Sequence, residues 1–252
     1  MNISKPSNSY DGPVIVIVGP TASGKTGAAI ELAKKVGGEV ISADSRAIYK
    51  YMDIGTAKPS KEEMDGVPHF GIDLVEPGER FTVADFKAYA EQKIAEIRER
   101  GHVPIVAGGT GLYVDALVYN YHFNETVQKS YADRQEMEKG YTIFGIKWDM
   151  DKLRERLTIR ERQLYCEDLF NETKFLVEKY GWDSQAMKSN IYQFAWKYMQ
   201  SELSLEEAIE QNIYDDYHLA KRQMTWFKRN DNIIWLPLKQ IVAEACKIVA
   251  QS

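Results

Sequence analysis

The sequence predicts an α/β fold, with a parallel β-sheet flanked by helices. Residues 13–18 (PVIVIV) form a continuous apolar, β-branched run, which is typical of a strand buried on both faces of a parallel sheet. A glycine-rich segment follows at once, and residues 27–38 (GAAIELAKKVGG) then combine helical spacing with a glycine pair suited to a C-terminal cap. A length of 252 residues fits one large domain with a small insertion better than two independent halves.

Two further strands are predicted in the N-terminal half. Residues 39–43 (EVISA) form one, and residues 101–111 (GHVPIVAGGTG) contain the other, which ends in glycines. Residues 81–100, between these strands, have the pattern of an amphipathic helix with Thr82 as its cap. Another helix is expected to begin within residues 112–117.

The C-terminal half is expected to be mostly helical. Residues 141–148 (YTIFGIKW) predict a strand, and residues 150–211 alternate acidic and basic side chains along exposed helix faces. Residues 120–140 are polar and weakly periodic, and they are too few for an independently packed domain. We therefore expect a first part of a P-loop core at 1–119, a truncated helical insertion at 120–140, and the completed core with a helical C-terminal part at 141–252.

Charge and composition narrow the class of protein. The formal net charge of −5 excludes the overall attraction to phosphate backbones that basic nucleic-acid binders show, so any RNA contact is expected to be local. Cys166 and Cys246 lie far apart, and therefore neither a disulfide framework nor a zinc site is indicated. The N-terminal segment lacks the apolar core of a signal peptide, and no run of about 18 apolar residues occurs. We expect a cytoplasmic protein without a membrane span.

The segment GPTASGKT, residues 19–26, matches the phosphate-binding P-loop pattern G-x-x-x-x-G-K-[ST]. Its glycines allow backbone N–H groups and a helix N-terminus to face an anion, while Lys25 adds charge and Thr26 offers a hydroxyl to Mg²⁺. A chance glycine turn is the alternative, and the predicted strand and helix on either side disfavour it. The expected diphosphate contacts are Gly19, Thr21, Ala22, Ser23, Gly24, Lys25 and Thr26.

Asp44 is the acidic residue that we expect to decide the chemistry, because it follows the second predicted strand directly. Open α/β sheets bind their ligands at the carboxyl ends of their strands. A carboxylate placed there beside a phosphate site could hold Mg²⁺, or it could take a proton from an attacking nucleophile. A helix cap or a turn is the structural alternative for this aspartate. For Asp73, in the segment FGID, we favour such a turn role.

Four segments, in this order, resemble the bacterial tRNA dimethylallyltransferase family. They are GPTASGKT (19–26), SADSRAIYKYMDIGTAKP (42–59), AGGTGLY (107–113) and YHLAKRQMTWFKR (217–229). The parts DIGTAKP and AKRQ-TWF are far more specific than a P-loop alone. The resemblance implies the transfer of a dimethylallyl group from dimethylallyl diphosphate to N6 of an adenine next to the anticodon of tRNA, with release of pyrophosphate.

The same resemblance implies roles for individual residues. Asp44 matches the general base of the family, and Thr110 matches a threonine near the reacting centre. Lys25, Thr26 with Mg²⁺ as the cofactor, and Arg222 would stabilise the departing diphosphate. An adenine stacked in an RNA loop must be extruded before its amine can react, which costs a few kcal/mol.

Contacts to the RNA are expected from two parts of the chain. Asp44, Ser45 and Arg46 match the segment of the family that contacts the RNA, and Arg160 and Gln223 are further candidates. A solvated helix face with internal ion pairs is the alternative for the arginine-rich run that contains Arg160 (RERLTIRER, 154–162). The aromatic pair at 226–227 is more typical of core than of a base-stacking surface.

The sequence also departs from the family pattern. Members usually carry a longer helical insertion at the place of residues 120–140, and this insertion embraces the anticodon stem and loop. Ala47 stands where the family often has Gln, Tyr51 where it often has Gly, and residues 191–193 (IYQ) where it often has Ile-Gly-Tyr. We expect the chemistry to be retained and the recognition of tRNA to be loosened.

Three other functions remain open from the residues alone. An adenylate isopentenyltransferase would act on free AMP, ADP or ATP, and a small-molecule kinase could use residues 154–162 as an arginine-rich lid. A non-catalytic RNA-binding or nucleotide-binding module is the third. The DIGTAKP and AKRQ-TWF segments resemble the tRNA-modifying branch and favour an enzyme acting on tRNA. We expect the chain to be a monomer.

Overall fold

The computed structural model describes residues 9–123, 136–184 and 186–251. Within them, six parallel strands form one sheet in the order β3-β2-β4-β1-β5-β6. β1 lies in the middle, where its five apolar residues are almost completely buried. The strands are β1 (Val14–Val18), β2 (Gly38–Ser42), β3 (His69–Phe70), β4 (Val103–Gly108), β5 (Tyr141–Ile146) and β6 (Ile233–Leu236).

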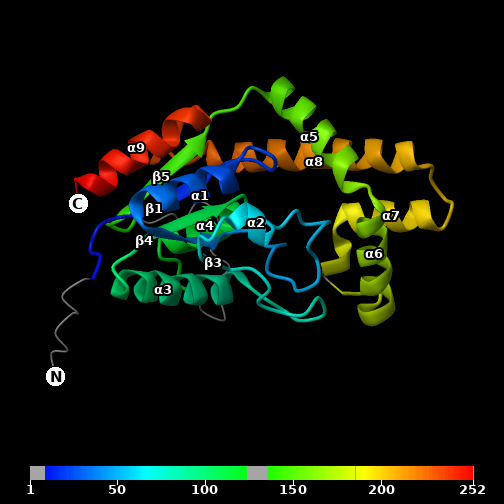
Figure 1. The fold of residues 1–252 in the computed structure, drawn as a ribbon, viewed down its shortest axis with the longest axis horizontal. Helices are drawn as coiled ribbons and strands as arrows, with labels where there is room; N and C mark the ends of the chain where they lie inside the picture. Colours follow the sequence, from blue (N-terminus) through cyan, green and yellow to red (C-terminus); the bar gives the residue numbers. More distant parts are fainter. Residues whose placement is uncertain (1–8, 124–135, 185, 252) are drawn as a thin grey trace.

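Helices cover both faces of this sheet, as Figure 1 shows. Alternate residues of β1 explain the two layers, because successive side chains of a strand point to opposite faces. Ile15 and Ile17 pack with α1 (Lys25–Val36) and α9 (Leu238–Ala250) on one side. The valines of β1 pack on the other side with α3 (Val83–Glu99) and α4 (Gly111–Val118). The short helix α2 (Lys61–Met64) lies between β2 and β3 along the chain.

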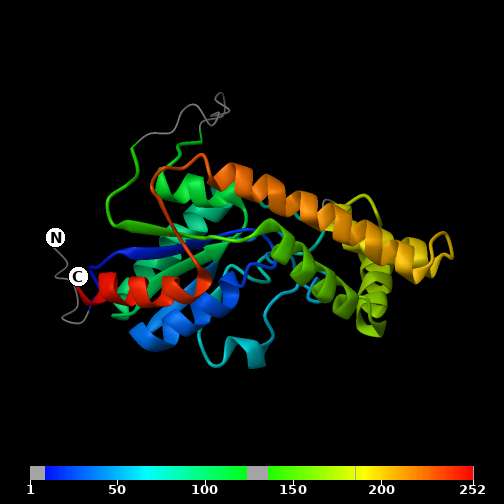
Figure 2. The same ribbon diagram turned by 90° about the horizontal axis from the view of Figure 1, so that it is seen from above.

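The remaining helices form a lobe beside the carboxyl ends of the strands (Figure 2). They are α5 (Met150–Leu164), α6 (Glu167–Tyr180), the short 3₁₀ helix η2 (Ala186–Lys188), α7 (Asn190–Met199) and α8 (Leu205–Phe227). The lobe has its own core, in which Leu169, Leu176 and Tyr192 pack with Ile48 and Met52 from the segment after β2. That segment therefore belongs to the sheet by sequence and to the lobe by packing.

Helix α8 returns from the lobe to the sheet. Phe227 is buried against α4, and the indole nitrogen of Trp226 donates to Asp115 at 2.9 Å. A methyl group at Gly111 would lie 2.2 Å from the Trp226 ring, so glycine is needed for the two helices to approach this closely. The expectation that these aromatics belong to the core is confirmed.

The predicted strands and helices of the sheet are confirmed, and so is the α/β class with a helical C-terminal part. β3, β6 and the full length of α9 are additions to the prediction. Residues 124–135 of the expected insertion lie outside the described residues, so the division at 120–140 stays a prediction. No helix in the described ranges has the length and apolarity that crossing a membrane requires.

A close contact between β2 and β4 brings the ends of these strands together. The N–H of Ala43 donates to Ala107 at 2.9 Å, and the N–H of Thr110 donates to Ala43 at 3.2 Å. A methyl group at Gly108 would lie only 2.1 Å from the carbonyl oxygen of Ala43. The absence of a side chain at Gly108 therefore allows Asp44 and Thr110 to become neighbours.

Replacing Gly108 by alanine should destabilise the fold. The added methyl group would force the ends of β2 and β4 apart, and we expect a loss of about 1–3 kcal/mol in the free energy of unfolding. Gly27→Ala is the matched control, because a methyl group there meets no atom within 4 Å and α1 gains a better helix former. Urea unfolding of both variants checks this; equal stability of G108A and G27A would contradict the proposed close contact.

Candidate active site

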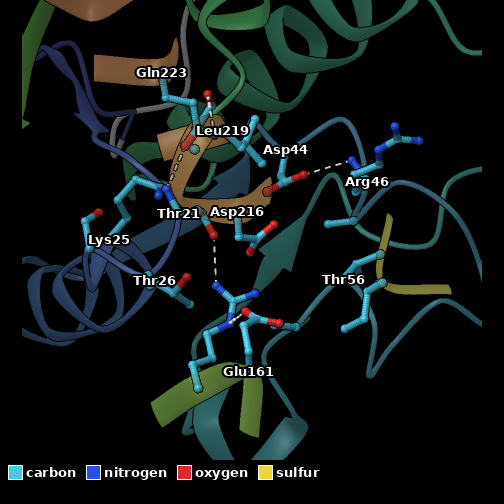
Figure 3. A pocket seen from close by; sticks show the side chains of 18 of the residues that line it. Thr21, Lys25, Thr26, Asp44, Arg46, Thr56, Glu161, Asp216, Leu219 and Gln223 are labelled. Carbon is cyan, nitrogen blue, oxygen red and sulfur yellow. Dashed lines mark hydrogen bonds and ion pairs between the residues drawn. The ribbon is translucent and has the colours of Figure 1, made fainter. Parts of the chain in front are cut away.

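A cavity of about 1250 Å³ opens at the carboxyl ends of the strands. Residues 21–27 of the P-loop form one wall, residues 55–59 form part of the opposite wall, and α5 and α8 border the space between them. In Figure 3, Lys25 and Thr26 lie on one side of the cavity and Thr56 on the other, with Asp44 between them. The site thus lies where parallel α/β sheets place their ligands.

The P-loop is held in shape by its own glycine and by hydrogen bonds from two other segments. Gly24 precedes α1 with φ +88°, a left-handed conformation that glycine adopts without strain. The indole nitrogen of Trp148 donates to the carbonyl oxygen of Ser23 at 2.9 Å. From α8, the Gln223 amide oxygen accepts from the N–H of Thr21 at 2.7 Å, and its nitrogen donates to Gly109 at 3.1 Å. The loop is therefore preformed for an anion.

The sequence suggested that Gln223 contacts RNA, whereas in the structure its side chain bonds to the backbone of two loops. Both ends of its amide are engaged by backbone groups, so it joins the P-loop to the end of β4. Direct contact with RNA stays a prediction for this residue, and the bridge is what the structure shows.

Lys25 is half-buried at the base of the cavity, where its ammonium group donates to the carbonyl oxygen of Pro20 at 2.6 Å. Burial lowers the pKa of Lys25 to about 8; Asp44 raises it and Arg160 lowers it further. The ammonium group is thus charged at neutral pH but close to losing its proton. A bound anion would favour the charged form.

Asp44 and Thr110 are linked through Ser45. The Thr110 hydroxyl accepts from the backbone N–H of Ser45 at 3.0 Å and donates to the Ser45 hydroxyl at 3.2 Å. The Asp44 carboxylate accepts from the backbone N–H of Arg46 at 2.8 Å, which fixes the turn after β2. These contacts hold a carboxylate beside the P-loop.

The structure places Arg160 differently from the prediction of an RNA contact. Its guanidinium group donates to the Thr21 hydroxyl at 2.9 Å, so it lies against the P-loop. The arginine-rich run divides: Arg156 also lines the cavity, whereas Arg162 pairs with Glu206 on the surface. Helical geometry explains this, because residues four apart share a face and residues two apart do not.

A pair of acidic side chains beside Arg160 was missed by the sequence analysis. Glu161 is completely buried and accepts from the side-chain amide of Asn212, and its carboxylate lies 3.7 Å from the Arg160 guanidinium group. Burial and the neighbouring charge of Asp216 raise the pKa of Glu161 to about 8, and burial also raises the pKa of Asp216. The pair therefore carries a proton at neutral pH. The sequence did contain a sign of this burial, because Glu161 follows the buried Leu157 by four residues and therefore lies on the same face of α5.

Most of the predicted site residues meet in this one cavity. Its lining includes Thr21 to Thr26 of the P-loop, Asp44, Ser45, Arg46, Thr110, Arg160, Arg222 and Gln223. Gly19 is the exception, because it lies behind the loop, where a methyl group would approach the Ser23 hydroxyl to 3.0 Å. Among the described residues, no three His, Cys, Asp or Glu side chains cluster as a metal site would require.

Comparison with known families matches most of the chain. The family described as IPP transferase matches residues 47–142 and 126–230, and the family described as Isopentenyl transferase matches residues 12–75. The two IPP transferase segments overlap at residues 126–142, and most of this overlap falls in the expected short insertion at 120–140.

Individual relatives and structures agree with these matches. The tRNA dimethylallyltransferase of Acetivibrio thermocellus is 38% identical over 285 aligned positions, which cover 88% of this chain and 91% of the relative. The full-length tRNA isopentenylpyrophosphate transferase of Bacillus halodurans superposes with a TM-score of 0.85 at 31% identity, covering 96% of this chain and 98% of that one. The tRNA delta(2)-isopentenylpyrophosphate transferase of Staphylococcus epidermidis gives 0.84 at 33% identity, with coverages of 96% and 100%.

Replacing Glu161 by glutamine should change how stability depends on pH. The unfolded chain releases the Glu161 proton near pH 4.5, whereas the folded protein keeps it up to about pH 8, so the wild type loses stability as the pH rises between these values. Glutamine cannot ionise, and its advantage over the wild type should grow from pH 5 to pH 8 and then level off. Thermal unfolding across this range measures it, with Glu155→Gln on the same helix as the exposed control. A constant difference at all pH values would contradict the buried pair.

Proposed function

The chain belongs to the IPP transferase family, and on that premise we propose that it transfers a dimethylallyl group from dimethylallyl diphosphate to N6 of an adenine in tRNA. The observation that carries the proposal is that the P-loop, Asp44 and Thr110 border a single cavity. A donor diphosphate on the P-loop and an acceptor amine beside Asp44 would meet between them. The names of the relatives favour an RNA acceptor over a free nucleotide.

The P-loop wall suits the diphosphate of the donor. Backbone N–H groups at the start of α1, the Lys25 ammonium group and the Arg160 guanidinium group supply hydrogen bonds and positive charge. Arg222, which lines the same cavity, adds a further cation. As the bond between the allylic carbon and the diphosphate oxygen breaks, these groups stabilise the charge on the departing pyrophosphate.

Magnesium is the metal that this site suits. Thr26 lies in the first turn of α1 with its hydroxyl toward the cavity (Figure 3). Mg²⁺ in proteins commonly takes one or two protein oxygens together with substrate phosphates. The bound ion would neutralise charge on the diphosphate.

Asp44 is suited to act as the general base. The N6 nitrogen forms a bond to the allylic carbon, and one proton must leave the amine as the new bond forms. The Asp44 carboxylate would accept this proton, while the Ser45–Thr110 contacts keep it in place. The transfer is then balanced: one carbon–oxygen bond breaks, one carbon–nitrogen bond forms, and the proton passes to the base.

The acceptor is proposed to be the adenine next to the anticodon, reaching the cavity from the side of Arg46 and Thr56, opposite the P-loop. The alignment with the A. thermocellus relative spans 285 positions, more than the 252 residues of this chain, so the relative has residues that this chain lacks. The family match is divided into two segments that overlap at residues 126–142, and this division supports a shortened insertion at 120–140. Surfaces outside the insertion must then contribute to the binding of the tRNA.

Replacing Asp44 by asparagine should abolish transfer without preventing donor binding. Asparagine keeps the hydrogen bond to the N–H of Arg46 but cannot accept the amine proton, and we expect the turnover rate to fall about 10²- to 10⁴-fold. Labelled dimethylallyl diphosphate and an anticodon stem-loop measure transfer, and calorimetry measures pyrophosphate binding. Asp65→Asn, on the surface, is the control. Near-normal turnover of D44N would remove Asp44 from this role.

Replacing Lys25 by methionine should weaken pyrophosphate binding and remove part of its pH dependence. The loss of a charged hydrogen bond is expected to weaken binding about 10- to 100-fold at pH 7. Because the wild-type ammonium group loses its proton near pH 8, wild-type affinity should fall faster above that pH than the affinity of K25M. The ratio of the two dissociation constants between pH 7 and pH 9 cancels the ionisation of pyrophosphate itself. A ratio that does not change with pH would contradict this assignment.

A further inference from the structure

Tyr51 has a backbone conformation that is unusual for its side chain. Its φ of +63° lies in the left-handed region, which costs a bulky residue about 1 kcal/mol or more and costs glycine almost nothing. Strained residues of this kind concentrate at functional sites. The ring also remains 43% exposed, so burial does not explain its retention.

The Tyr51 ring is part of a small surface that we call the aromatic platform: Tyr51, Phe175 and Lys179. The rings of Tyr51 and Phe175 meet edge to face with centroids 5.6 Å apart, and Phe175 is 42% exposed. The Lys179 ammonium group lies 4.4 Å from the Tyr51 centroid and 5.4 Å from that of Phe175. Exposed aromatic rings beside a cation are the surfaces on which proteins stack unpaired bases.

The aromatic platform is joined to the wall of the cavity through Glu172. This residue lies one turn before Phe175 on α6, and its carboxylate accepts from the backbone N–H groups of residues 53, 54 and 55 at 2.8–2.9 Å. It also accepts from the Tyr192 hydroxyl at 2.8 Å. Residues 55–59 continue from there as the cavity wall opposite the P-loop. The platform is therefore continuous with the side from which the acceptor enters.

We propose that the aromatic platform stacks an unpaired nucleotide of the acceptor RNA, next to the nucleotide whose adenine enters the cavity. The proposal rests on the proposed function and specifies its RNA contact. Extrusion of one base leaves its neighbours without a stacking partner, and exposed rings beside the entrance can supply one. Glu76 lies 3.8 Å from Lys179 and 3.3 Å from Lys50, so its carboxylate neutralises part of the positive charge of the two lysines, and stacking on the rings is expected to dominate the contact.

The decisive variant is Tyr51→Gly, because it removes the ring and relieves the strain at the same time. Binding is measured with an anticodon stem-loop that carries 2-aminopurine beside the target adenine. We expect Y51G to bind this RNA about 5- to 50-fold more weakly, and to leave the 2-aminopurine fluorescence unquenched. Pyrophosphate binding should stay at its wild-type value, and the thermal midpoint should not fall, because relief of the strain offsets the lost contact between the two rings. Tyr214→Ala is the matched control, since Tyr214 is 63% exposed on α8 away from the platform.

Two further measurements identify the kind of contact. Phe175→Ala removes the second ring and should give a similar loss, which decides the matter even if Y51G folds poorly. The loss of RNA affinity should also be equal at low and high salt, because stacking releases no counterions. If the contact were ionic, the substitution would cost less affinity at high salt than at low salt.

Wild-type RNA affinity and quenching in both Y51G and F175A would overturn the platform. A platform that binds another protein instead would give that same result. If the wild type neither binds nor modifies any RNA in this assay, the proposed function fails together with the platform. If the wild type modifies the RNA while both variants bind it normally, the platform alone fails.

Discussion

The side-chain amide of Gln223 forms the interaction on which the arrangement of the site depends. With one oxygen and one nitrogen it bonds to the P-loop at Thr21 and to the end of β4 at Gly109. One turn away, Trp226 anchors the same helix to α4. Because these contacts fix the last turns of α8, they also fix where Arg222 and Asp216 face. A helix docked by apolar packing alone could slide along the sheet edge, whereas two directional hydrogen bonds set its register.

Charge is balanced in the cavity by shifts of protonation in both directions. Burial moves Lys25 toward its neutral form, and it moves the Glu161–Asp216 pair toward a protonated form. Both shifts lower the number of buried charges before any ligand is present. A diphosphate would reverse the first shift, since it restores a partner to the Lys25 ammonium group. The proton on the acidic pair leaves Arg160 less neutralised, and therefore more available to the P-loop side of the cavity.

With a shortened insertion, the proposed function would give the segment after β2 a larger share of the contacts with the acceptor. That segment packs into the helical lobe through Ile48 and Met52, and Glu172 holds its backbone at residues 53–55. Tyr51 lies between Ile48 and the backbone that Glu172 holds, so contacts on both sides fix the position of its ring. In a relative with glycine at this position and a longer insertion, the same backbone turn would form without strain and without the ring.

Local pattern was sufficient to predict β1, β2, β4 and β5, the P-loop and the positions of Asp44 and Thr110 at strand ends, because burial, periodicity and glycine spacing act over a few residues. The tertiary structure decided that Arg160 faces the P-loop, that Gln223 bridges two loops and that Glu161 is buried against Asp216. Each of these depends on how α5 and α8 pack, and that packing joins residues more than fifty positions apart. The left-handed turn at Tyr51 belongs to the same group, since only long-range contacts on both sides can hold a tyrosine there.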